Sequence, residues 1–188
     1  MYWLLSGIAL FTVIHLTASA LPSLRRSVRE AIGHTTYRAV FAVLAIIGFV
    51  LIVVGWRSVT PIAIYSPPAW GPTLALPLMF VAVILFGAAH ARTNIKRIVR
   101  HPQLTSIVLW SIAHLAANGD SRSLILFGSL GVWAAIEIAL INRRDGEWLK
   151  PDRATMRNEL IGAAVGVVVF LVLFALHPYF AGVSPVPM

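Results

Sequence analysis

Long runs of apolar residues, separated by short polar or proline-containing breaks, dominate this 188-residue chain. Each run comes close to the roughly 20 residues that a helix needs to cross a bilayer. The runs extend over Trp3 to Leu21, Ala39 to Trp56, Leu74 to Ala89, Leu104 to Ala117, Leu124 to Ile141 and Leu160 to Leu176. This pattern predicts an all-α, polytopic transmembrane bundle of about six spans that forms a single domain over residues 1–188.

The fourth run is the shortest, and it ends at Asn118-Gly119-Asp120, which is a strong turn signal. We therefore expect the fourth and fifth runs to form a short helical hairpin, with Asn118 and Asp120 closing the turn. In the last run, Gly162 and Gly166 form a G-x-x-x-G pattern, which predicts a close contact between helices.

The overall composition places the chain in lipid. Apolar residues make up 59% of it and charged residues 12%, with a mean hydropathy of +0.84. Soluble domains average about 45–50% apolar and about 25% charged residues. Too few polar residues are present to cover the outside of a soluble core. The chain has no cysteine, which excludes disulfides, thiolate metal sites and cysteine nucleophiles.

The charged residues indicate orientation. Lys and Arg number 15 against 7 Asp and Glu, and the formal net charge is +8. All but Arg57 and Arg122 lie in the loops after the first, third and fifth runs. The positive-inside rule then predicts that these three loops are cytoplasmic and that both termini lie on the other side. We expect a lipid bilayer, and no nucleic acid, as the partner of this positive charge.

The first run could be mistaken for a secretory signal, because Ala18-Ser19-Ala20 resembles a cleavage site. However, no basic residue precedes the run and a basic cluster follows it. Since this is the reverse of a signal peptide's polarity, we expect the first span to be retained.

Three ionisable residues lie inside the predicted spans: His15, His114 and Glu137. Such groups are costly in hydrocarbon and tend to mark a functional site or a buried partner. His15 falls about 10–12 Å and His114 about 15 Å above the cytoplasmic surface, at about 1.5 Å per helical residue. The two imidazoles could therefore hold a haem iron between helices. Alternatively, each could bond to a nearby backbone or hydroxyl group and only tighten packing. His90 and His177 fall near span ends and are interpreted as interfacial.

Glu137 lies at a depth close to that of His15. It could extend toward Arg143 or Arg144, or pair with Arg100, at the cytoplasmic interface. It could instead accept a hydrogen bond from the second ring nitrogen of a histidine that binds metal, and so orient that ring.

Two blocks of sequence carry a family resemblance. The central block contains Arg100-His101-Pro102 followed by Ser111-Ile112-Ala113-His114 and Asn118-Gly119-Asp120. The N-terminal block contains His15, then Leu21-Pro22-Ser23-Leu24-Arg25. Together they resemble the NnrU family over most of the chain, which identifies residues 1–188 as a single NnrU-like domain.

NnrU proteins are bacterial integral membrane proteins associated with denitrification and nitric oxide metabolism, so the resemblance implies the bacterial inner membrane and a possible association with denitrification enzymes. The family is similar to the membrane domain of 15-cis-zeta-carotene isomerases, which holds haem b for a double-bond isomerisation. Their ligand-bearing histidines match His15 and His114. The isomerases carry a cysteine where this chain has Ser111, so a thiolate-linked ligand switch is not implied here. The remaining arrangements are iron held by two histidines, or five-coordinate iron with one histidine and an open position.

Arg100-His101-Pro102 also resembles a short motif of isoprenylcysteine carboxyl methyltransferases, although their carboxylate-rich cofactor segment is not apparent. Pro102 can start a helix, while Arg25, Arg100 and His101 could contact a haem propionate. Ser111, Asn118, Asp120 and Glu137 are candidates for the second layer around the haem.

The resemblance, together with the two histidines inside the spans, therefore implies a haem b protein that serves nitric oxide metabolism, with iron held by His15 and His114. Three alternatives stay open. One is a membrane isomerase acting on a lipophilic polyene or isoprenoid, and another is a cofactor-free scaffold for maturation of nitric oxide or nitrite reductase. The least favoured is an S-adenosylmethionine-dependent methyltransferase.

Overall fold

The structure is a computed structural model that describes residues 1–185. In that range the chain forms seven α-helices and one short 3-10 helix, η1. Their bounds are α1 (Tyr2–Ala20), α2 (Pro22–Ile32), α3 (His34–Ser58), α4 (Gly71–His90), η1 (Asn94–Arg97), α5 (Pro102–Ala117), α6 (Ser121–Asp145) and α7 (Met156–Ala181). By length and composition, α1, α3, α4, α6 and α7 can each cross a membrane. The predicted all-α polytopic bundle is confirmed.

The apolar runs found in the sequence agree closely with the positions of the helices in the structure. The first run overlaps α1 and extends one residue beyond it, and each of the others lies inside one helix. The fourth run corresponds to α5, whose 16 residues span about 24 Å at 1.5 Å per residue. This length is less than the roughly 30 Å of a bilayer core, as expected for a short fourth element.

The described chain forms two compact units, each built from two separate stretches of sequence. Unit 1 comprises Met1–Ser66 and Gly119–Gly146, and unit 2 comprises Pro67–Asn118 and the chain from Glu147 onward. Unit 1 therefore contains α1, α2, α3 and α6, while unit 2 contains α4, η1, α5 and α7. Because α5 and α6 belong to different units, their packing as a hairpin stays a prediction.

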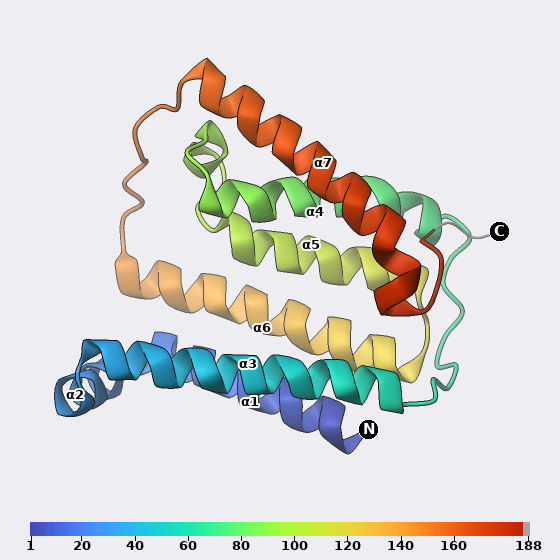
Figure 1. Ribbon diagram of the computed structural model, residues 1–188, viewed down its shortest axis with the longest axis horizontal. Helices are drawn as coiled ribbons and strands as arrows, with labels where there is room; N and C mark the ends of the chain where they lie inside the picture. The colour runs from blue at the N-terminus through green and yellow to red at the C-terminus, as the bar shows by residue number, and fades with distance from the viewer. Residues whose placement is uncertain (186–188) are drawn as a thin grey trace. The chain divides into compact units, whose positions relative to one another are not determined.

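In unit 1, α1 packs against both α3 and α6 (Figure 1). The contact between α1 and α3 depends on glycines that let the backbones approach closely. A Cβ placed on Gly7 would lie 2.6 Å from the backbone nitrogen of Ile52, and one on Gly55 would lie 2.5 Å from Cα of Leu4. Small residues are the usual means of close helix packing in membranes.

The stretch after α1 is an additional helix, where the sequence analysis expected only a basic loop. Pro22 occupies the first turn of α2, a position that proline favours because its fixed φ suits the helix and its missing N–H would be unpaired there. Gly33 follows α2 with a φ of +84°, which suits a glycine at a helix end. All residues of α2 are exposed.

Asp120 caps the start of α6. Its carboxylate accepts hydrogen bonds from the backbone N–H groups of Arg122 and Ser123, both at 3.1 Å. The loop after α3 joins this cap, because the N–H of Ile64 donates to the carbonyl of Gly119 at 2.8 Å. At the other side of the turn, Nδ2 of Asn118 donates to the carbonyl of His114 at 2.9 Å.

In unit 2, α4 packs against α5 and α7. A Cβ on Gly71 would overlap the carbonyl oxygen of Ala116, so the start of α4 lies directly on α5. A Cβ on Gly166 would meet the side chain of Ile84 on α4, whereas one on Gly162 would meet nothing within 4 Å. The predicted close contact of the G-x-x-x-G pattern is therefore correct for Gly166 and wrong for Gly162.

Glu159, in the first turn of α7, connects that helix to η1. Its carboxylate accepts hydrogen bonds from Oγ1 of the buried Thr93 at 3.0 Å and from the backbone N–H of Asn94 at 2.5 Å. The side chain of Asn94 extends the contact, because its Oδ1 accepts from the N–H of Ala154 at 3.0 Å.

Replacing Glu159 by alanine is expected to lower the free energy of unfolding by about 2–3 kcal/mol, because it removes hydrogen bonds to a charged acceptor and leaves two donors unpaired. Glu159→Gln keeps one amide oxygen as an acceptor and should lose less. Glu147→Ala removes an exposed glutamate from the same unit and serves as the control. Denaturant titration in detergent micelles measures all three; equal stability of Glu159→Ala and Glu147→Ala would contradict this role.

Candidate functional site

His15 lies in unit 1 among aromatic side chains. Its Nδ1 is 2.7 Å from the carbonyl oxygen of Phe11, one turn earlier in α1. Its ring centroid lies 4.3 Å from that of Phe11, 4.9 Å from Phe41 on α3 and 5.4 Å from Trp133 on α6. Since a carbonyl can only accept, Nδ1 carries the proton, and Nε2 is the nitrogen that could coordinate a metal.

Two buried polar groups lie one helical turn apart on α6. Trp133 is 5% and Glu137 3% exposed, and neither Nε1 of Trp133 nor Oε1 of Glu137 has a hydrogen-bond partner within residues 1–185. In that part of the chain, no hydrogen bond or ion pair joins Glu137 to His15. Arg144, one of the predicted partners of Glu137, forms an ion pair with Asp145 at 2.7 Å and also interacts electrostatically with Glu137. Since unpartnered buried polar groups are costly, this part of unit 1 fits an additional polar group or ligand.

His114 occupies a similar position on α5 in unit 2. Its Nδ1 lies 2.8 Å from the carbonyl oxygen of Trp110, which again places the proton on Nδ1. The Trp110 ring centroid is 5.1 Å from that of His114. One turn earlier, Ser111 is 3% exposed, and its hydroxyl has no hydrogen-bond partner within the described chain.

His177, near the end of α7, lies beside His114. The two ring centroids are 6.4 Å apart, with an angle of 26° between the ring planes. Nδ1 of His177 is 2.8 Å from the carbonyl oxygen of Val183. The sequence analysis placed His177 at an interface and did not connect it with His114, because nothing in the spacing along the chain indicates that α5 and α7 bring them together.

The predicted ligand pair of His15 and His114 is divided between the two units, so that pairing stays a prediction. The candidate propionate contacts are divided in the same way. Arg25 is exposed on α2 in unit 1, whereas Arg100 and His101 are half-buried in unit 2, directly before α5. Pro102 is the first residue of α5, which confirms its predicted place at a helix start.

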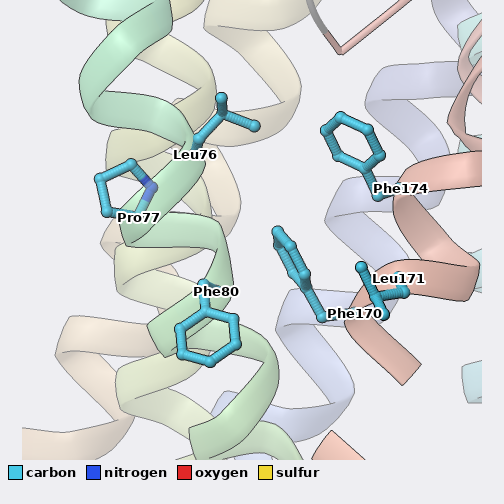
Figure 2. Close-up of a pocket in the computed structure, with 6 residues that line it drawn as sticks. All are labelled: Leu76, Pro77, Phe80, Phe170, Leu171 and Phe174. Carbon is cyan, nitrogen blue, oxygen red and sulfur yellow. The ribbon is translucent and has the colours of Figure 1, made fainter. Parts of the chain in front are cut away.

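An apolar groove lies between α4 and α7 of unit 2 (Figure 2), with a volume of about 430 Å³. Phe80 on α4 meets Phe170 on α7 edge to face, with ring centroids 5.3 Å apart. The lining residues share an apolar character: Leu76, Pro77, Phe80, Phe170, Leu171 and Phe174. The groove can accommodate a hydrocarbon chain, but it offers no acid, base or metal ligand.

No cluster of three or more histidine, aspartate or glutamate side chains suited to a metal ion occurs within residues 1–185. A haem iron, however, takes only one or two ligands from the protein, since the porphyrin supplies the others. His15 and His114 fit this requirement as single imidazoles, each with Nδ1 bonded to a carbonyl in an aromatic environment.

Comparison with known proteins gives one positive result. The family profile described as NnrU protein matches residues 3–185. No match was found among curated proteins or among solved structures. Because the profile extends over nearly the whole chain and both units, the protein belongs to the NnrU family.

Proposed function

We propose that this protein binds haem b in the bacterial cytoplasmic membrane and serves nitric oxide metabolism during denitrification. His15 and His114 are the proposed axial ligands. The observation that carries the proposal is that both motif histidines sit in apolar helices, have an aromatic ring within about one turn, and carry their proton on Nδ1. Family membership supplies the link to denitrification.

The surrounding residues suit this ligand set. The carbonyls of Phe11 and Trp110 fix the orientation of the two imidazoles, as second-layer partners of metal ligands do. Ser111 provides a hydroxyl where the similar isomerases have a thiol, so ligation here relies on imidazole. Arg100 and His101 could bind a propionate by charge-assisted hydrogen bonds.

When bound, haem b supplies a redox-active iron whose reduction potential depends on its axial ligands and on the polarity around it. The residues of this chain would set that environment. Phe11, Phe41 and Trp133 would exclude water around His15. The buried carboxyl of Glu137 would accept a hydrogen bond close to that cluster.

The orientation in the membrane is part of the same proposal. The basic residues from Arg25 to Arg38, from Arg92 to Arg100 and from Arg143 to Arg157 would lie on the cytoplasmic side. Both termini would then lie on the opposite side, and Arg100 and His101 would be at the cytoplasmic interface.

A second candidate function, isomerisation of a polyene or isoprenoid lipid, is favoured by the groove between α4 and α7. Its volume of about 430 Å³ falls within the usual range of about 300–1,000 Å³ for ligand sites. Its apolar lining suits a hydrocarbon chain.

Extraction of the purified protein with organic solvent, followed by chromatography, separates these candidates. The proposal predicts about one haem b per chain and no enriched polyene. Haem b together with a polyene would favour the isomerase. Neither compound, after expression with sufficient haem, would overturn the haem proposal and leave a scaffold for maturation of nitric oxide or nitrite reductase.

A further inference from the structure

The helix α2 has an apolar stripe and a basic flank, both exposed. Leu24, Val28 and Ile32 recur at intervals of four residues and are 47%, 37% and 42% exposed. At about 100° per residue, these three side chains fall within an arc of about 80°. The side chains of Arg25, Arg26 and Arg29 occupy the adjoining arc. A short helix with these two faces is typical of segments that lie in the plane of a membrane interface.

The arginines of α2 form no ion pair within the described chain. Neither of the two ion pairs described here, Arg122 with Asp120 and Arg144 with Asp145, involves an arginine of α2. The only acidic residue in α2 is Glu30, and the helix has no buried residue. Arg38, in the second turn of α3, is a further exposed positive charge. The cluster is therefore available to an anionic partner outside the chain.

The position of α2 brings this cluster to the membrane boundary. Only Leu21 separates it from α1, and only Gly33 separates it from α3. Both neighbours can cross a membrane by length and composition. Figure 1 shows α2 at the end of the pair formed by α1 and α3, away from the N-terminus of α1. Because both ends of α2 are joined to membrane helices, it cannot move far from the headgroup layer.

We propose that α2 is an anionic-phospholipid binding element. Leu24, Val28 and Ile32 enter the boundary between headgroups and acyl chains, and Arg25, Arg26 and Arg29 bind lipid phosphates. Clusters of basic residues beside a membrane helix bind anionic lipids in this way, and each arginine near the surface contributes about fivefold in affinity. This inference does not depend on haem.

The test uses the full-length protein in nanodiscs that contain phosphatidylcholine and phosphatidylglycerol. Spin-labelled forms of each lipid report how strongly it associates with the protein. The wild-type protein should prefer phosphatidylglycerol, and the triple variant Arg25→Gln/Arg26→Gln/Arg29→Gln should lose most of that preference. High salt, on the order of 1 M, should reduce it as well, since the screening length falls to about 3 Å.

The matched control is Arg143→Gln/Arg153→Gln/Arg157→Gln, which removes three exposed charges from the end of α6, the loop that follows it and the first turn of α7. It should keep the lipid preference. Equal loss in both triple variants, or no preference in the wild-type protein, would overturn the proposal.

A second measurement locates the helix in the membrane. Because the natural chain has no cysteine, Val28→Cys and Ser27→Cys each provide a single site for a nitroxide label. The label at position 28 should be accessible to oxygen dissolved in lipid, and the label at position 27 to a water-soluble nickel reagent. Equal access of the nickel reagent to both would show that α2 stands away from the bilayer and would contradict the proposal.

Discussion

Replacing Gly55 by alanine is expected to lower the free energy of unfolding by about 3 kcal/mol, at the upper end of the range for overpacking. The added Cβ would overlap the backbone of Leu4, a residue that is fully buried between the helices. A change of rotamer cannot relieve a clash with backbone atoms. The helices α1 and α3 would have to separate, which would also loosen their contact at Gly7. Denaturant titration in detergent micelles measures the loss.

Gly128→Ala provides the control for this substitution. Gly128 lies in α6 of the same unit, and a Cβ there would meet nothing within 4 Å. Its replacement should leave stability unchanged or raise it by up to about 1 kcal/mol, because alanine favours a helix over glycine. If Gly55→Ala were as stable as Gly128→Ala, the close packing of α1 on α3 described here would be wrong.

The largest functional effect is expected for His114→Ala. Loss of a residue that only orients a metal ligand typically weakens metal binding by roughly 10–100-fold. Removing the axial ligand itself should weaken haem binding by at least as much. His15→Ala should likewise shift or abolish the haem absorption band. His90→Ala is the matched control. Nδ1 of His90 lies 3.1 Å from the carbonyl oxygen of Phe86, the same type of hydrogen bond as in His15 and His114, but His90 is exposed.

His177→Ala distinguishes between two ligand sets. If His15 and His114 bind the iron, loss of His177 should leave the band in place. If the band instead depends on His114 and His177 and is indifferent to His15, the second ligand has been assigned incorrectly. Unchanged spectra in both His15→Ala and His114→Ala would contradict the proposed ligation altogether.

The helices that cross the membrane could be predicted from the sequence because their signal is local. In hydrocarbon every backbone polar group must be satisfied within the segment, so a long apolar run is compatible only with a helix. The same reasoning recognised that the run forming α5 is short. By contrast, α2 was treated as a loop because its arginines were counted as an orientation signal. The spacing of Leu24, Val28 and Ile32 would have revealed it.

Contacts between helices could not be predicted in this way, because they depend on which faces meet. The G-x-x-x-G pattern in α7 predicted a close contact at Gly162, which the structure does not have. In unit 1, close contacts between helices occur at Gly7 in α1 and Gly55 in α3, and no such pattern marks these two glycines. The bond of Glu159 to Thr93 likewise joins residues far apart in sequence. No local pattern indicates such a pair.

For the candidate site, the sequence identified His15 and His114, and the structure describes their surroundings separately. It adds Trp133 beside His15 and His177 beside His114. Neither neighbour follows from spacing, since each lies on another helix. The unpartnered Oε1 of Glu137 is also a structural observation, because the sequence could indicate only that a carboxylate lies at about the depth of His15.

The absorption spectrum of the wild-type protein, purified in detergent after expression with sufficient haem, tests the central claim most directly. Haem b bound by histidine predicts a Soret band in the oxidised protein that shifts on reduction, with about one haem per chain. A folded, purified protein without a Soret band under those conditions would contradict the account.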